Sequence, residues 1–110
     1  AKLAEVDDMI TIYEGRIENT LPFFVSQQKQ SKFSFVFCDT DLYSSTSAIM
    51  QHMWYQLSIG GVMVFDQWNT LEFPGEGIAV NEFLESIPGS FEMIKPQNTR
   101  QPSLALRRKL

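Results

Sequence analysis

The sequence FVFCDTDLYSST, residues 35–46, joins an apolar run to a turn that carries two carboxylates, Asp39 and Asp41. The apolar run begins at Phe33, and residues 33–38 are almost continuously apolar and aromatic. Such a run is typical of a strand in a parallel sheet that is buried on both faces. We therefore predict a buried strand over residues 33–38 that delivers both acids to its carboxyl end.

A helix is expected directly after this turn. Ser44 or Ser45 can cap it, and its apolar side chains recur at intervals of three and four residues, as on one face of a helix. These apolar residues are Ile49, Met50, Met53, Trp54 and Leu57. Residues 59–61 are expected to stop the helix, and residues 62–65 to form a second apolar strand that ends at Asp66. A strand, a helix and a strand in this order predict two parallel strands, the βαβ unit.

Weaker patterns extend the scheme upstream. Residues 10–13, ITIY, predict a strand, and a short helix is expected to start near Asn19 or Thr20. The side chains expected to face inward from that helix are Leu21, Phe24 and Val25.

Downstream of Asp66, a further helix is expected to end at residues 88–89, which are Pro-Gly. Its apolar side is formed by Ala79, Val80, Phe83, Leu84 and Ile87. Residues 91–94 and 103–108 predict the last strands, and the alternation of apolar residues in the second one is typical of an outer strand. The fold class that these elements predict is α/β.

The composition is that of a globular domain. The chain has 110 residues, 44% of them hydrophobic and 20% charged, so we expect a single domain. The net charge of −4 argues against nucleic-acid partners, which are bound through their phosphates. The only cysteine, Cys38, gives no internal disulfide and favours a reducing, cytoplasmic compartment. No apolar run reaches the ~18 residues of a membrane-spanning helix, so we expect no membrane partner.

The acids at the predicted strand ends form the candidate site. Ligands of an open parallel sheet bind at the carboxyl ends of its strands. Neighbouring strands lie ~4.8 Å apart, so Asp39 and Asp66 can converge on one small ligand. Carboxylate oxygens suit Mg²⁺. A single acid at a strand end ordinarily caps a loop or a helix N-terminus, but three acids at two paired ends favour a ligand site.

Asp39 and Asp41 also form an Asp-x-Asp motif. In many glycosyltransferases this motif holds a divalent cation against a nucleotide-sugar diphosphate. The three-residue pattern is weakly specific, and it does not explain why a Gly-Gly, strand and Asp segment follows. A metal-dependent glycosyltransferase stays open as an alternative function.

Residues 35–46, followed by LSIGGVMVFDQWNTLEFPGEGIAVNEFLES at residues 57–86, resemble the macrocin O-methyltransferase-like family of S-adenosyl-L-methionine-dependent methyltransferases. ITIYEGRIENTLP, residues 10–22, is similar to the family's upstream strand-Gly-x-x-x-x-Thr-Leu-Pro segment. The resemblance implies a Rossmann-like methyltransferase fold. This chain would hold the C-terminal part of its sheet, with parallel strands, flanking helices and an antiparallel strand at the end, but without the N-terminal cofactor-binding strands.

The resemblance also implies roles for matching residues. Asp39 falls at the position of the family's metal ligand or general base. Asp66 matches the first acid of a pair, whose second member is Gln67 here, so a metal site formed by Asp39, Asp66 and Gln67 would lack one negative charge. Gly15 and Arg16 fall where the family's chain passes the adenine of the cofactor.

Three further residues are expected to shape the site. Asp41 and Tyr43 match the rest of the family's first motif. Trp68 follows the second strand end and either lines the substrate or cofactor pocket or packs on the edge of the sheet.

The implied activity is methyl transfer from S-adenosylmethionine to a hydroxyl group of a small molecule, with a sugar as one candidate. Asp39 would take the hydroxyl proton, or a bound Mg²⁺ would lower the pKa of the hydroxyl. An alternative is a non-catalytic methyltransferase-like interaction module, to which the replacement at Gln67 points.

The glycine-rich turn and the ribose-binding acid of this fold are expected upstream of Ala1, because no equivalent occurs in these residues. We therefore expect the full-length protein to be an enzyme, and the chain alone to be inactive and to self-associate through the uncovered strand at residues 33–38.

Overall fold

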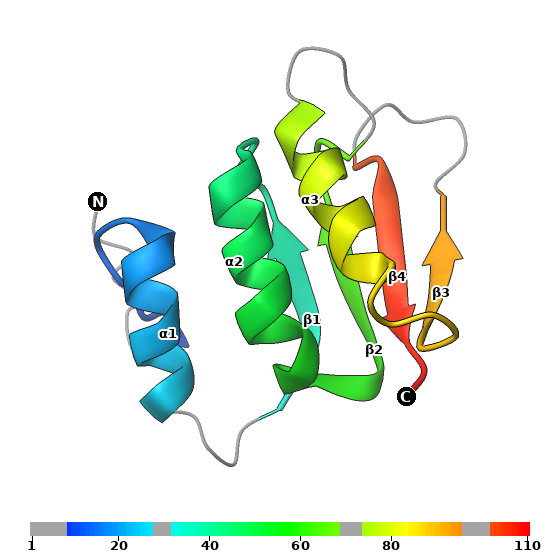
Figure 1. Cartoon of the computed structure of the whole chain (residues 1–110). Coiled ribbons are helices and arrows are strands. Elements are labelled where there is room, and N and C mark those ends of the chain that lie inside the picture. Colours follow the sequence, from blue (N-terminus) through cyan, green and yellow to red (C-terminus); the bar gives the residue numbers. More distant parts are fainter. Residues whose placement is uncertain (1–8, 28–31, 69–73, 96–101) are drawn as a thin grey trace.

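The computed structural model describes residues 9–27, 32–68, 74–95 and 102–110 (Figure 1). The described elements are the helices α1 (Ile17–Gln27), α2 (Tyr43–Met53) and α3 (Pro74–Leu84), the 3-10 helix η2 (Trp54–Gln56), and the strands β1 (Phe33–Cys38), β2 (Leu57–Phe65), β3 (Phe91–Ile94) and β4 (Leu104–Arg108). The four strands form one sheet in the order β1-β2-β4-β3. Helices α2 and α3 lie side by side on one face of this sheet, and α1 lies next to α2 (Figure 1). The predicted α/β fold is confirmed.

The central βαβ unit has the predicted geometry. Strands β1 and β2 are parallel, with Val36 opposite Met63 and Cys38 opposite Phe65. Both strands therefore end at the same edge of the sheet, which is the edge that carries the candidate acids.

The position of the last strand differs from the prediction. Strand β4 pairs antiparallel with both β2 and β3, so it is an inner strand and β3 is the outer one. Leu104 and Leu106 of β4 have no exposed surface, whereas the next residue, Arg107, is exposed. The alternation arises because the described helices cover one face of the sheet, and not because the strand lies at an edge.

The prediction that residues 33–38 are buried on both faces is wrong for this chain. Cys38 is buried, but the side chains of Phe35 and Phe37 are 59% and 49% exposed. Successive side chains of a strand point to opposite faces, so these two phenylalanines lie on the face that no described helix covers. Strand β1 is also an edge strand of the four-stranded sheet.

The predicted helix stop at residues 59–61 is also wrong. Helix α2 ends at Met53, η2 follows, and Gly60 and Gly61 lie inside β2. The register between β1 and β2 shifts between Phe33 and Phe35, so β2 carries extra residues there. Gly60 accommodates this irregularity with a φ of +87°, a conformation that glycine adopts without steric cost.

The N-terminal region departs from the prediction in a similar way. Residues 10–13 form no strand, and Ile12 is 81% exposed, because no described strand lies beside this segment to accept its hydrogen bonds. Helix α1 begins at Ile17, earlier than predicted, and the Arg16 carbonyl accepts hydrogen bonds from the N–H groups of Asn19 and Thr20. Leu21, Phe24 and Val25 pack against the core, as predicted.

The core lies between the sheet and the helices α2 and α3. Its fully buried large side chains are those of Met50, Trp54, Leu57, Met63, Phe65, Leu104 and Leu106. Burial of such an apolar side chain contributes ~1.5–3 kcal/mol to folding. The core therefore stabilises the strands whose ends carry the candidate acids. In the part of the chain that the structure describes, no helix is long and apolar enough to cross a membrane.

Candidate functional site

The carboxyl ends of β1 and β2 bring Asp39 and Asp66 together. The Asp66 N–H donates a hydrogen bond of 3.1 Å to the Cys38 carbonyl, so the turns that follow the two strands begin side by side. Partial burial, the negative charges of Asp39 and Asp41, and a hydrogen bond to the Asp39 carboxylate together raise the pKa of Asp66. Loss of hydration and the neighbouring carboxylates thus both disfavour the charged form of Asp66.

Gln67 lies beside this pair but presents a donor to it. Its side-chain amide nitrogen donates to Asp66 Oδ2 at 3.3 Å, which partly counteracts the rise in the pKa of Asp66. Across the described ranges, no group of three or more His, Cys, Asp and Glu side chains is placed to hold a metal ion. The Gln67 side chain thus turns an N–H donor, and not its carbonyl oxygen, toward Asp66, whereas a hard cation requires oxygen ligands. The arrangement therefore does not support the expected Mg²⁺ site.

A buried glutamate that sequence reasoning missed connects the two strand ends. Glu76, in the first turn of α3, has no exposed surface. Its Oε1 accepts a hydrogen bond of 3.1 Å from the Asp41 N–H, and its Oε2 accepts one of 2.8 Å from the Gln67 N–H. The Thr40 N–H contributes a further hydrogen bond. Burial raises the pKa of Glu76, and these backbone donors lower it in part.

The glycines on either side of Glu76 are the sequence feature that could have indicated its buried position. A Cβ at Gly77 would lie 2.1 Å from the Trp68 carbonyl oxygen, and one at Gly75 would lie 2.7 Å from the Tyr43 nitrogen. Only residues without a side chain allow the start of α3 to approach both turns so closely. The sequence Gly-Glu-Gly thus marks a glutamate that is inserted between backbones.

Asp41 has an unusual backbone conformation. Its φ is +64°, in the left-handed region that residues other than glycine rarely adopt. Its Oδ1 atom is buried and has no hydrogen-bond partner within the described residues. Strain and unsatisfied buried polar atoms are concentrated at functional sites, so this residue belongs to the candidate site together with Asp39 and Asp66.

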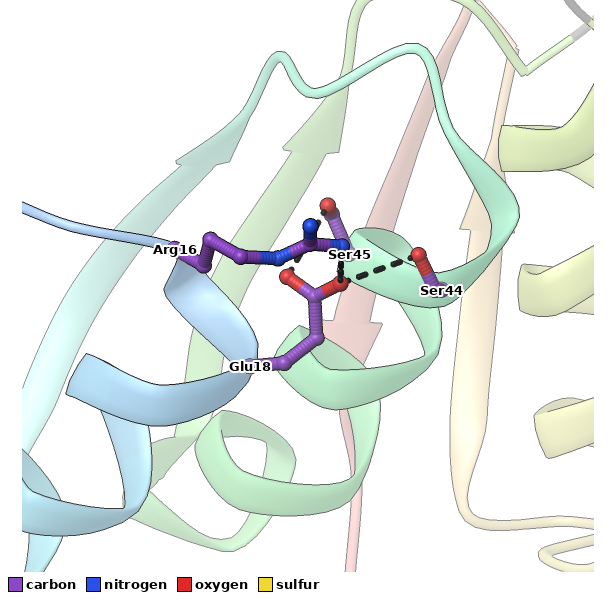
Figure 2. Close-up of polar contacts among 4 residues, drawn as sticks. All are labelled: Arg16, Glu18, Ser44 and Ser45. Atoms are coloured by element: carbon purple, nitrogen blue, oxygen red, sulfur yellow. Dashed lines mark hydrogen bonds and ion pairs between the residues drawn. The ribbon is translucent and has the colours of Figure 1, made fainter.

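The serines predicted to cap α2 have a different partner. The N-cap residue is Leu42, without a side-chain cap, and both serines lie inside the first turn of the helix. Their hydroxyl groups donate to the carboxylate of Glu18 in α1, at 3.1 Å from Ser44 and 3.4 Å from Ser45 (Figure 2). Glu18 thus supplies, from another helix, the negative charge that the N-terminus of α2 favours.

Arg16 reaches the same carboxylate and so lies near the acid-bearing edge. Its guanidinium forms an ion pair with Glu18 Oε2 at 3.3 Å (Figure 2). The hydrogen bonds to the Glu18 backbone N–H and to Ser44, together with Arg16, hold the pKa of Glu18 below its usual value. The structure therefore brings Arg16 to the first turn of the helix that follows Asp39.

Gly15 lines a separate cavity of about 380 Å³, together with Thr11, Tyr13, Ile17, Thr20, Leu21 and Phe24. Small-ligand sites are typically ~300–1,000 Å³ and mostly apolar, so the volume and the lining of this cavity are within the range of such sites. Gly15 has a φ of +129°, and a side chain there would meet Thr20. The predicted role of Gly15 at the adenine is consistent with this geometry and stays a prediction.

Two of the expected site residues are engaged with α3. The Tyr43 hydroxyl donates to Glu82. Trp68 Nε1 donates to Asn81 Oδ1 at 3.1 Å, and its ring packs against the core beneath the Lys95 ammonium, 5.3 Å away. Trp68 thus contacts α3 and the core, and its expected role in lining a pocket stays a prediction.

Cys38 is inert core, as its burial predicts. Burial first, and the charge of Glu76 second, raise the pKa of its thiol to about 12. A thiol of this kind is not a nucleophile at neutral pH.

Comparisons with known proteins find a matching family model and similar solved structures. A family model described as macrocin-O-methyltransferase (TylF) matches residues 2–94. The apo structure of CalS11, a TDP-rhamnose 3'-O-methyltransferase in calicheamicin biosynthesis, is 25% identical with a TM-score of 0.74 over 87% of this chain and 39% of that chain. A second CalS11 structure is 26% identical with a TM-score of 0.70, over 94% of this chain and 42% of that one.

A third solved structure is similar in fold alone. It is the Podospora anserina methyltransferase PaMTH1 with bound SAH, which is 19% identical with a TM-score of 0.59 over 96% of this chain and 52% of that chain. The chain thus spans about two fifths of the length of the CalS11 chains that it matches. No curated protein matches the sequence.

Proposed function

The chain belongs to the macrocin-O-methyltransferase (TylF) family, and from this premise we propose that it forms the acid-bearing part of an S-adenosylmethionine-dependent O-methyltransferase. The proposed acceptor is a hydroxyl group of a small molecule, with a nucleotide-linked sugar as the first candidate. The similarity to CalS11, which is described as a TDP-rhamnose 3'-O-methyltransferase, supports this acceptor. The fold shared with PaMTH1, which was solved with SAH, supports the cofactor.

The pairing of Asp39 with Asp66 carries the proposal. S-adenosylmethionine, when bound, supplies a methyl group that is already activated, so the protein mainly aligns the acceptor and removes its proton. Asp39 accepts the proton of the hydroxyl group, and Asp66 retains it in the shared hydrogen bond. The raised pKa of Asp66 suits this role because proton transfer is most effective when the pKa of the group approaches the working pH.

The other residues of the site hold this pair and the cofactor. Asp41 is proposed to shape the acceptor side of the site, and Gln67 orients Asp66 through its amide. Gly15 and Arg16 are proposed to face the adenine side of the cofactor, where the cavity beside Gly15 provides apolar walls. The proposal assigns no step to Mg²⁺.

Substitution of Asp39 tests the proposed function. In the complete protein, Asp39→Asn is expected to lower methyl transfer by ~10²–10⁴-fold, the contribution of a general base, because the amide cannot accept the proton. The measurement is the rate of methyl transfer from labelled S-adenosylmethionine to a panel of nucleotide-linked sugars. Glu92→Gln is the matched control, since Glu92 is an exposed acid that pairs with Arg107 on β4.

Two results would contradict the proposal. One is an Asp39→Asn rate within about threefold of the wild-type rate. The other is a complete protein that binds neither S-adenosylmethionine nor any hydroxylated acceptor, which would favour the non-catalytic interaction module instead.

A further inference from the structure

The carboxylate of Glu76 has partners that a helix-terminal acid does not ordinarily have. A glutamate in the first turn of a helix usually bonds back to the backbone of its own N-terminus, as in the capping box. Glu76 instead accepts hydrogen bonds from Gln67, nine residues away, and from Asp41, 35 residues away. Its two oxygens therefore bind the turn after β1 and the turn after β2 at the same time.

The Glu76 carboxylate is buried, so it depends on these hydrogen bonds to replace the water that it has lost. An ionised carboxylate without partners in the interior is strongly unfavourable, and Glu76 has no exposed surface. Backbone N–H groups from Thr40, Asp41 and Gln67 compensate for the lost water. Hydrogen bonds to an ionised acceptor are about twice as strong as neutral ones. The Glu76 carboxylate therefore fixes the positions of the three backbone amides.

Each acid of the site either donates one of these amides or is next in the chain to a residue that does. Asp41 is held through its own N–H in the left-handed conformation that buries its Oδ1. Asp66 is the neighbour of Gln67, and Asp39 is the neighbour of Thr40. The turns that carry both members of the acid pair are thus attached to the same buried carboxylate.

We infer that Glu76 is a positioning residue, which sets the mutual geometry of Asp39, Asp41 and Asp66 by holding the backbone amides of their two turns. Its effect on turnover rests on the proposed function, whereas its effect on geometry does not. A side-chain amide at position 76 retains one acceptor oxygen and presents an N–H group to a backbone N–H. One turn is then released, while the volume at the buried position is unchanged.

The experiment compares Glu76→Gln and Glu76→Ala with Glu85→Gln in the complete protein. Glu85 lies just after α3 and is exposed, so it is the matched control. Glu76→Gln is expected to lower kcat by ~10–10²-fold, the cost of a misplacement of about 1 Å at a reacting group, and to leave the KM for S-adenosylmethionine within about twofold. Formate is expected to restore part of the kcat of Glu76→Ala by occupying the space of the missing carboxylate.

The NMR readouts are independent of activity. Glu76→Gln should shift the amide signals of Thr40, Asp41 and Gln67 and the side-chain carboxyl signals of Asp39 and Asp66, whereas Glu85→Gln should leave them in place. If the wild type transfers no methyl group, the proposed function fails, and these signals alone decide the positioning role. If Glu76→Gln does not fold, the kcat and signals of folded Glu76→Ala, with and without formate, decide it.

The inference is overturned by either of two results. The first is carboxyl signals of Asp39 and Asp66 that stay unchanged in a folded Glu76 variant. The second is a kcat per folded molecule that falls only as the folded fraction falls and does not respond to formate, which is the behaviour of a residue with a purely structural role.

Discussion

At the scale of single residues, the chain places its carboxylates in environments with opposite effects on their pKa values. Asp66 and Glu76 are partly or fully removed from water, and their pKa values are raised. Glu18 accepts hydrogen bonds at the N-terminus of α2, and its pKa is lowered. Burial thus disfavours the charged forms of Asp66 and Glu76, whereas the hydrogen bonds to Glu18 favour its charged form between two helices.

This contrast predicts the pH dependence of the link between α1 and α2. A carboxyl group whose pKa is lowered by folding stabilises the protein above its unfolded pKa of about 4.5, and the contribution is lost as the pH falls through the folded value. Glu18→Gln should therefore lower the urea midpoint at pH 7, and the difference from wild type should shrink in acid. Asp66 and Glu76 act with the opposite sign, so variant and wild type must be compared at each pH.

The control for this measurement is Glu92→Gln, which removes the ion pair with Arg107. The side chain of Glu92 is 52% exposed and that of Arg107 is 45% exposed. Such pairs contribute ~0–1 kcal/mol, so its midpoint should stay near that of wild type. A difference between Glu18→Gln and wild type that is equally large in acid would mean that the carboxylate charge is not what holds the helices together.

At the scale of elements, the start of α3 is the contact on which the site depends. The helix reaches both strand ends only because Gly75 and Gly77 leave room for the backbones of Tyr43 and Trp68. Helix propensity alone would favour alanine over glycine by ~1 kcal/mol. Close packing and local propensity are therefore in conflict at Gly77, and packing has the larger effect.

Substitution of Gly77 tests this conclusion. Gly77→Ala places a Cβ 2.1 Å from the Trp68 carbonyl oxygen, so the helix or the turn must move. We expect a net loss of stability of ~1–3 kcal/mol, as in other over-packed sites, measured from urea unfolding. Ile78→Ala, at a half-exposed position of the same helix, is expected to change the stability by less than about 0.5 kcal/mol. A Gly77→Ala variant that is more stable than wild type would show that propensity has the larger effect.

At the scale of the whole molecule, the sheet is incompletely covered. Strand β1 lies at the edge, and Phe35 and Phe37 are 59% and 49% exposed on the face that the described helices leave open. An unpaired edge and an uncovered apolar face both favour association with another chain. We propose that the 110-residue chain on its own associates with copies of itself through β1.

Light scattering over a range of concentrations checks this proposal. The chain should form dimers or larger species, and Phe37→Lys should shift it toward the monomer because the charge opposes burial of the face. Phe23→Lys is the control, since Phe23 is 60% exposed but lies on α1. A wild-type chain that stays monomeric at every concentration would contradict the proposal.

Local pattern was enough to identify the parts of the molecule that depend on neighbours in the sequence. A strand at residues 33–38, a helix after it, a helix after Asp66 and the parallel pairing of β1 and β2 were predicted, but both helices end earlier than expected, at Met53 and Leu84. The placement of Asp39 and Asp66 at one edge followed from that pairing, because parallel strands joined by a helix end on the same side.

Tertiary structure decided the features that depend on segments far apart in the chain. The inner position of β4, the exposed face of β1 and the absence of a strand at residues 10–13 each depend on which other elements lie alongside. The same is true of Ser44 and Ser45, which bind Glu18 on another helix, and of Glu76, whose partners lie in two separate turns. Sequence periodicity determines which side of an element is apolar, whereas hydrogen-bond partners and coverage are set only when the assembled sheet brings distant backbones together.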